Sequence, residues 1–297
     1  MIEHASETLA PVSIVLNIWN GDNHVSLRRS LESILRQNYQ PNEVVIVLDG
    51  PINDNLKEVI SHFLGQKQTL FRVIETTMTT GLWNARNIGI EAAKNEFIAL
   101  HDADDVMHPS RLHLQAAKIE AIMADVIIGP VIEFDAESER VIGVRRLCDN
   151  SSFERKMLLQ NTINHSSVML RKSKVLEVGG YRNIYLAEDY DLWLRMLKCN
   201  KKFYCDSQIL QGFSVDKKLS SRRGGLKFFK SEFQISRSVS NLGKLSMLKL
   251  FFVFVLRIVY RTSPRIVRRF HREYFQIEKV QSHKTLSDFL GSDLLTS

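Results

Sequence analysis

Residues 97–105 are Phe97-Ile98-Ala99-Leu100-His101-Asp102-Ala103-Asp104-Asp105, a short apolar run that ends in a cluster of carboxylates. The run is typical of a buried strand, because it is short, apolar and bounded by polar residues. Open α/β sheets bind ligands beyond the carboxyl ends of their strands, so this position favours a binding role for Asp102 and Asp104. Two such carboxylates could share one hard cation with the phosphate oxygens of a substrate. Solvation of a loop, or capping of the next helix, would explain them equally well.

Similar apolar runs occur earlier in the chain, at 12–16, 44–48 and 71–74. The segments between them have apolar residues at helical spacing, so strands and helices alternate. This alternation predicts a Rossmann-like α/β domain with a mostly parallel central sheet and helices on both faces. Pro109 is expected to be the first residue of a helix that runs to about Met123.

Beyond Val126 the pattern becomes more strand-like, and Gly179-Gly180 then interrupts the chain before an amphipathic helix that begins near Glu188. The shorter elements expected in this part are strand-like runs at 126–134 and 141–147, a helix at 153–159 and a strand at 167–170.

The positive charge is concentrated at the end of the chain. Residues 217–297 carry 17 Lys and Arg against 5 Asp and Glu, a net charge of +12, whereas the whole chain carries +7. This split predicts an α/β domain over 10–216 followed by a helical basic region over 217–297. Such a region would be attracted to anionic surfaces such as lipid head groups or nucleic acid.

The segment 245–260 is strongly apolar, but Lys249 and Arg257 leave its apolar core shorter than the roughly 20 residues of a spanning helix. The basic residues on both sides favour a helix that lies in the interface of an anionic membrane, with packing on the protein's own core as the alternative. The N-terminus lacks the basic start and apolar run of a secretory signal. We therefore expect a cytoplasmic protein, peripheral on the inner face of the cytoplasmic membrane if this helix binds lipid.

Asp49 also follows an apolar run directly, so its carboxylate is expected at the same edge of the sheet as Asp102. A carboxylate there could accept a hydrogen bond from a nucleobase N–H. Asn17 and Trp19, after the first run, could add a polar contact and an aromatic face. A plain β-turn at Asp49-Gly50-Pro51 and core packing of Trp19 are the simpler alternatives.

Arg86 lies near the start of a predicted helix and could bind a diphosphate through two parallel hydrogen bonds, or be an ordinary exposed helix residue. Glu188 and Asp189 open the last predicted helix, where acidic side chains stabilise the N-terminus without any catalytic role. Transfer of a group to a hydroxyl needs a carboxylate base, and Asp189 is the best-placed candidate. His165 is more simply a hydrogen-bonded buried histidine than a catalyst.

In their order along the chain, these motifs resemble glycosyltransferase family 2, a group of inverting enzymes with the GT-A fold. Each motif is weak alone, and the set is specific. The likeness spans about 12–215 and is carried by six stretches: 12–20, 31–39, 47–51, 81–87, 102–105 and 187–193.

The resemblance implies a role for each matching residue. These roles are nucleoside contact for Asn17, Trp19 and Asp49, proximity to the ribose and diphosphate for Asp102, metal ligation for Asp104 and base catalysis for Asp189. Two departures concern the nucleotide: Asn17 and Trp19 stand where Pro and Tyr are more usual, and Leu48 stands where many members have a second Asp.

We therefore expect an inverting transferase that uses Mn²⁺ or Mg²⁺ and moves a single sugar from a nucleotide sugar, a UDP-sugar by preference. Its Asp-Gly-Pro form at 49–51 resembles members that build bacterial capsule, exopolysaccharide or lipopolysaccharide, so the acceptor is a hydroxyl of a glycan or of a lipid-linked saccharide. Arg86 and the metal are expected to hold the donor diphosphate. The Gln-x-x-Arg-Trp motif of the processive synthases is missing from the sequence, which favours single addition.

Two other classes of protein remain as alternatives. A sugar-nucleotidyltransferase would need a Gly-rich phosphate loop after the first strand, whereas residues 17–23 contain only Gly21. A basic nucleic-acid-binding protein would suit the charge of the C-terminal region, but the rest of the chain has an acidic balance and shows no nucleic-acid-binding motif. We therefore expect no nucleic acid partner.

Overall fold

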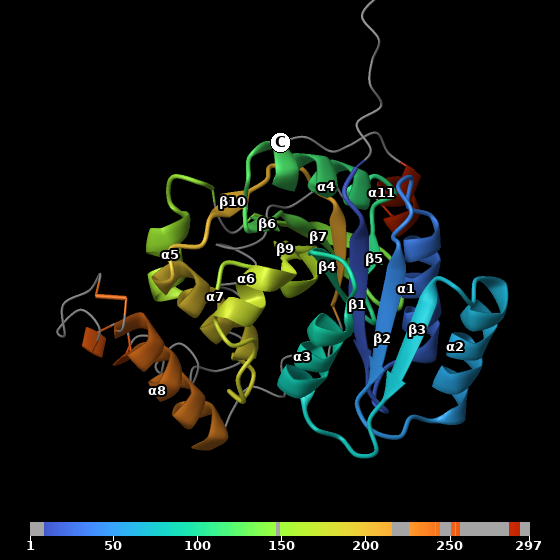
Figure 1. The fold of residues 1–297 in the computed structure, drawn as a ribbon, viewed down its shortest axis with the longest axis horizontal. Helices are drawn as coiled ribbons and strands as arrows, with labels where there is room; N and C mark the ends of the chain where they lie inside the picture. The colour runs from blue at the N-terminus through green and yellow to red at the C-terminus, as the bar shows by residue number, and fades with distance from the viewer. Residues whose placement is uncertain are drawn as a thin grey trace, which may run out of the picture.

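Two β-sheets organise the chain (Figure 1). The computed structural model describes residues 9–146, 149–215, 226–240, 242–243, 251–252, 254–255 and 285–291. The larger sheet has seven strands in the order β10-β6-β9-β4-β1-β2-β3, and all neighbours are parallel except that β9 is antiparallel to β4 and β6. These strands are β1 (Val12–Ile18), β2 (Glu43–Leu48), β3 (Phe71–Glu75), β4 (Phe97–Asp102), β6 (Val126–Ile128), β9 (Met169–Arg171) and β10 (Phe203–Cys205). The predicted mostly parallel sheet is confirmed.

Helices cover both faces of this sheet because alternate strand residues point to opposite sides. Ile14 and Leu16 of β1 pack with α1 (His24–Leu35), α2 (Asp54–Gln66) and α4 (Arg111–Ala121). Val15 packs in a second cluster on the other face, together with α3 (Leu82–Ala92), α5 (Phe153–Leu159), α6 (Lys172–Glu177) and α7 (Glu188–Lys198). Side-chain caps fix two helix starts: the side-chain oxygens of Asn23 and Asn53 accept backbone N–H groups of α1 and α2.

A smaller four-stranded sheet has the order β5-β11-β7-β8. Its strands are β5 (Val106–Met107), β7 (Val131–Asp135), β8 (Val141–Arg145) and β11 (Gln211–Val215). The prediction of one strand-like run over 126–134 is wrong, because Gly129-Pro130 divides it into β6 and β7, which belong to different sheets. Proline has no N–H to donate, so it ends a strand within a ladder.

Two other predicted boundaries are corrected by the structure. The helix expected from Pro109 begins at Arg111 as α4. The strand expected at 167–170 is instead a short 3-10 helix, η1 (His165–Ser167), followed by β9.

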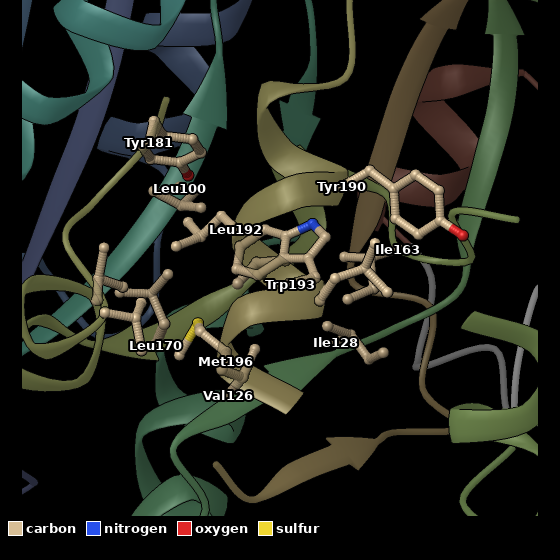
Figure 2. Packing of buried hydrophobic residues seen from close by; sticks show 14 of the residues in the cluster. Leu100, Val126, Ile128, Ile163, Leu170, Tyr181, Tyr190, Leu192, Trp193 and Met196 are labelled. Carbon is tan, nitrogen blue, oxygen red and sulfur yellow. The ribbon is translucent and has the colours of Figure 1, made fainter. Parts of the chain in front are cut away.

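The amphipathic pattern after Glu188 forms α7, and its apolar side is the centre of the core on that face (Figure 2). The view shows the indole of Trp193 lying between Leu192 and Ile163, with Met196 and, from β6, Ile128 below it. Trp193 is fully buried. The helix that carries Asp189 is therefore firmly held against the sheet.

The described part of the basic region packs on the rest of the chain in two places. From α8 (Leu226–Ser240), Ile235 and Val239 join the core cluster of α7, and α8 lies alongside α7 (Figure 1). From α11 (Leu286–Gly291), Leu286 and Phe289 pack against the smaller sheet. Most of the segment 245–260 lies outside the described residues. Within the described ranges, no helix is long and apolar enough to cross a bilayer.

Candidate functional site

The carboxyl ends of β1, β2 and β4 bring three predicted residues to one edge of the sheet. Asn17 of β1 lies directly opposite Asp102 of β4 in the parallel register, and Asp49 follows the last residue of β2. The amide oxygen Oδ1 of Asn17 is buried and has no hydrogen-bond partner among the described residues. Since an unpaired buried acceptor is costly, this oxygen suits a ligand that donates a hydrogen bond.

The carboxylate of Asp49 holds the loop that leads into α3. It accepts hydrogen bonds from the Thr80 N–H at 2.6 Å, the Thr80 hydroxyl at 3.0 Å and the Gly81 N–H at 3.1 Å. Gly81 has φ +95°, a conformation that favours glycine. Asp49 therefore fixes the start of α3, and its contact with a nucleobase stays a prediction.

Trp19 offers an exposed aromatic face beside this edge. The backbone N–H of Trp19 donates a hydrogen bond to the Asp22 carboxylate at 2.9 Å, and this bond holds the turn after β1. The indole lies over Gly21, where an added Cβ would come within 2.2 Å of the ring atom Cη2. Glycine at 21 is therefore required for this ring position.

Arg86 is buried, in contrast to an ordinary exposed helix residue. Its Nη1 lies 2.7 Å from the Glu188 carboxylate and its Nη2 lies 3.7 Å from Oδ1 of Asp102. The guanidinium also lies over the ring of Tyr181, 5.5 Å from its centroid. Arg86 thus links the carboxyl end of β4, through Asp102, to the start of α7, and direct contact with a diphosphate stays a prediction.

His165 lies in this cluster, although the sequence favoured a purely structural role for it. Its Nδ1 is 3.4 Å from Oδ1 of Asp102, and its Nε2 is 2.9 Å from the Tyr181 hydroxyl. Burial raises the pKa of Asp102, but His165 and then Arg86 outweigh it and hold that pKa below its ordinary value. Asp102 is therefore an oriented, ionised carboxylate. No local sequence pattern indicates this contact, because it depends on the pairing of β9 with β4.

Asp104 has the opposite surroundings. Burial, followed by the charges of Asp102 and Asp22, raises the pKa of Asp104 to about 7. An excess of negative charge at a partly buried carboxylate is the electrostatic condition that a divalent cation relieves. No group of three or more metal-binding side chains occurs in the part of the chain that the structure describes. The surroundings of Asp104 therefore suit a divalent cation, and its role as a metal ligand stays a prediction.

Asp105 has a structural role in the same cluster. Its carboxylate accepts the Ser214 N–H of β11 at 2.8 Å and the hydroxyl of Ser166, and it is fully buried. These bonds join β4 to the smaller sheet and to η1. Of the three carboxylates in residues 102–105, two therefore lie at the sheet edge and the third, Asp105, stabilises the fold.

Asp189 lies in the first turn of α7, as predicted. Its Oδ2 accepts a hydrogen bond from the Asn161 side-chain amide at 2.9 Å, and its Oδ1 accepts the Tyr190 N–H at 2.7 Å. The neighbouring Glu188 pairs with Arg86. Arg86 thus joins Glu188 to Asp102, and the charge of Asp189 also acts on Arg86 and Glu188.

Comparison with known proteins finds glycosyltransferases both by family model and by similarity of whole sequences. A family model described as Glycosyl transferase family 2 matches residues 13–180. The amylovoran biosynthesis glycosyltransferase AmsE of Erwinia amylovora is 28% identical over 260 residues, 87% of this chain and 96% of its own. An Escherichia coli UDP-Gal:alpha-D-GlcNAc-diphosphoundecaprenol beta-1,3-galactosyltransferase is 25% identical over 289 residues, 89% of this chain and 99% of its own.

Two solved structures share the fold. S. aureus TarS residues 1–349 in complex with UDP-GlcNAc has a TM-score of 0.63 at 16% identity, with 89% of this chain and 73% of that chain covered. The mannosyltransferase PcManGT of Pyrobaculum calidifontis in complex with GDP-Man and Mn²⁺ has a TM-score of 0.56 at 12% identity, with 90% and 84% covered. At these identities the likeness concerns the fold alone.

Proposed function

Since this chain belongs to glycosyltransferase family 2, and is a glycosyltransferase with the GT-A fold, we propose that it transfers one sugar from a UDP-sugar to a hydroxyl of a lipid-linked saccharide, with inversion. The observation that carries this proposal is the distribution of the carboxylates over two elements. Asp102 ends β4 and Asp104 follows it, whereas Asp189 lies in the first turn of α7, where Asn161 donates to its Oδ2 at 2.9 Å. One group of carboxylates serves the leaving group and the other serves the nucleophile.

In the proposed reaction Asp189 accepts the proton of the acceptor hydroxyl. The oxygen attacks the anomeric carbon while the bond from that carbon to the diphosphate oxygen breaks, and the electron pair leaves with UDP. A single displacement from the opposite face inverts the anomeric configuration. The bond from Asn161 to Oδ2 at 2.9 Å orients the carboxylate for this step.

The donor is proposed to lie along the ends of β1, β2 and β4. The indole of Trp19 stacks on the nucleobase, and the unpaired Oδ1 of Asn17 accepts a hydrogen bond from the nucleoside. Asp49, which holds the loop before α3, contacts the nucleoside from the end of β2. Asp102 faces the ribose and diphosphate, and Arg86 and His165 hold it in place.

Asp104 is proposed to hold a divalent cation, Mn²⁺ or Mg²⁺, together with diphosphate oxygens. When bound, such a cation neutralises the charge that develops on the departing diphosphate. The carboxylate's raised pKa of about 7 supports this assignment, and so does the Mn²⁺ bound to PcManGT.

The named relatives support the choice of substrates. The Escherichia coli relative takes UDP-Gal and a GlcNAc-diphosphoundecaprenol acceptor, and TarS is solved with UDP-GlcNAc. AmsE and the O-antigen glycosyltransferase WbnJ both act in bacterial polysaccharide biosynthesis. We propose the same setting for this chain.

The test is a transfer assay with labelled UDP-hexoses and UDP-N-acetylhexosamines against acceptors that carry a monosaccharide diphosphate on an alkyl chain. We expect a disaccharide product of inverted configuration by NMR, and loss of turnover with EDTA that Mn²⁺ or Mg²⁺ restores. A product of retained configuration would disprove inversion, and full activity in EDTA would remove the metal role. Hydrolysis of UDP-sugars without transfer to any acceptor would contradict the proposal as a whole.

We also propose that the 245–260 segment binds an anionic membrane surface, which would bring the enzyme to a lipid-linked acceptor. Phe251, Phe252 and Val255 are helical and exposed, and the surrounding sequence is rich in arginine. We expect the protein to sediment with phosphatidylglycerol vesicles but not with phosphatidylcholine vesicles. Replacing Phe251 and Phe252 by Ser should abolish sedimentation, whereas Leu176→Ser, at an exposed apolar residue outside this segment, should not. Equal binding of all three proteins would contradict the assignment.

A further inference from the structure

The turn immediately before α7 has an unusual backbone. It runs from Ile184 to Ala187, whose N–H donates to the Ile184 carbonyl at 3.2 Å. Leu186 within it has φ +54°, the left-handed region that side-chain-bearing residues rarely adopt. Such a conformation persists only where the surrounding structure enforces it, and it is often found at functional sites.

On the N-terminal side of the turn, Tyr181 helps to hold Leu186 in its left-handed conformation. The side chain of Asn87 accepts the Tyr181 N–H at 2.7 Å and donates to the Tyr181 carbonyl at 2.9 Å. The Tyr181 hydroxyl is held by His165 at 2.9 Å. The chain entering the turn is thus fixed at both its backbone and its side chain.

The C-terminal side is fixed by the buried pair between Glu188 and Arg86, at 2.7 Å. Ile184, within the turn, is buried in the core. The turn therefore has anchors before, inside and after it, and these hold Leu186 in its left-handed conformation.

This anchored turn presents two large apolar side chains to solvent. Tyr185 is 41% exposed and Leu186 is 43% exposed, and Asp189 follows three residues later. The hydrogen-bond partner of Asp189, Asn161, comes two residues after the exposed Leu159 at the end of α5. Exposed apolar residues therefore come shortly before both the carboxylate and its partner in the chain.

We propose that Tyr185 and Leu186 form the acceptor-binding platform, on which the apolar C–H face of the acceptor sugar ring packs while its hydroxyl edge meets Asp189. The proposal rests on the transferase activity proposed above. The donor nucleoside already has an aromatic face at Trp19, which follows β1, so the turn beside the base is left for the acceptor. Sites that bind small molecules are lined in this way, with apolar and aromatic contacts around a few polar groups.

The test compares kinetics of Tyr185→Ala and Leu186→Ala with those of Met123→Ala, using a UDP-sugar and an alkyl-diphosphate monosaccharide that the wild type accepts. Met123 is a matched control, because it has φ +51° and is 74% exposed, and it lies between α4 and the amino end of β6. We expect each platform variant to raise the acceptor KM by about tenfold. The donor KM and the slow hydrolysis of donor without acceptor should stay at the wild-type value, and Met123→Ala should change neither KM.

Leu186→Gly separates the side chain from the fold, since glycine adopts positive φ without strain. We expect it to raise the acceptor KM as Leu186→Ala does while its melting temperature is at least that of the wild type. An acceptor KM equal to wild type in the platform variants would overturn the platform and leave the transferase proposal standing. Absence of turnover by wild type with every donor and acceptor of the panel would overturn the proposed function and the platform together.

Discussion

Carboxylates only a few residues apart in the chain have different properties because their neighbours differ. Asp102 faces His165 and Arg86, which favour its charged form. Burial and the nearby carboxylates of Asp102 and Asp22 disfavour the charged form of Asp104. The carboxylate of Asp105 accepts a hydrogen bond from Ser214 of β11. A triplet of acidic residues in a sequence therefore says little until the surroundings of each residue are known.

Asp189→Asn is expected to lower kcat by about 10²–10⁴-fold, because the amide cannot take the acceptor proton. Binding of UDP-sugar, measured by calorimetry, should stay within twofold of wild type. Asp54→Asn is the control, since Asp54 is an exposed acid in the first turn of α2 and tests the loss of a helix N-terminal charge alone. Wild-type turnover in Asp189→Asn would show that another group is the base.

Asp104→Asn is expected to stabilise the metal-free protein at pH 8. The pKa of Asp104 is raised to about 7, so between about pH 4 and 7 the folded protein keeps a proton that the unfolded chain releases. Its contribution to stability is therefore full below the unfolded pKa and is lost as the pH rises through 7. In EDTA the variant's melting temperature should exceed that of the wild type by about 2–4 °C at pH 8.

The same variant separates the pH effect from the metal effect. At pH 5 the melting temperatures of variant and wild type should converge, and at pH 8 Mn²⁺ should stabilise the wild type but not Asp104→Asn. An equal difference at both pH values would show that Asp104 is not the titrating group.

At the scale of elements, α3 connects the two halves of the site. Asp49 fixes its first turn through Thr80 and Gly81, and its Arg86 and Asn87 hold the segment that leads to Asp189. The helix therefore connects Asp49 to the segment that leads to Asp189.

Gly180→Ala is expected to disturb this connection more than Gly179→Ala. Both glycines have positive φ, so both substitutions strain the backbone. A Cβ at Gly180 would lie 2.5 Å from Oδ1 of Asn87 and displace the side chain that holds Tyr181, whereas a Cβ at Gly179 meets nothing within 4 Å. We expect Gly180→Ala to be about 1–3 kcal/mol less stable than Gly179→Ala by urea unfolding, with a lower kcat. Equal losses would show that only the backbone conformation matters.

The sequence predicts the elements whose signals are local and misses those that depend on pairing between distant segments. The runs that form β1, β2, β3 and β4 were readable because parallel buried strands are short and continuously apolar. The division of 126–134 between two sheets was not readable from the sequence, because Gly129-Pro130 is the only interruption between the residues of β6 and those of β7. His165 was expected to be a hydrogen-bonded buried residue, but its contact with Asp102 was not predictable, because η1 lies beside β4 only once β9 is in place.

At the scale of the molecule, α8 is part of the core and does not only carry charge. Ile235 is fully buried against the α7 cluster, and Ser238 donates to the buried Asp191 of α7 at 2.8 Å. The charge asymmetry that predicts a separate basic region says nothing about these contacts, since apolar packing determines them.

Ile235→Ala is expected to lower the free energy of unfolding by about 2–4 kcal/mol, through lost burial and a cavity between α8 and α7. Phe233→Ala removes a larger side chain from the same helix, but Phe233 is 64% exposed, so its effect should stay within about 0.5 kcal/mol. Denaturant melts of the full chain measure both. Equal effects would show that α8 does not pack on α7 in solution.

The position of β9 has a consequence for synthesis on the ribosome. In chain order β9 is the sixth of the seven strands, yet it lies between β4 and β6 and joins them. A nascent chain released as far as residue 110 already contains Asn17, Asp49, Asp102 and Asp104, but it exposes the open edge of β4 until residue 171 emerges. The segments that carry Asn17, Asp49, Asp102 and Asp104 are thus delivered first, and Asp189 follows only after β9, the strand that covers the edge of β4.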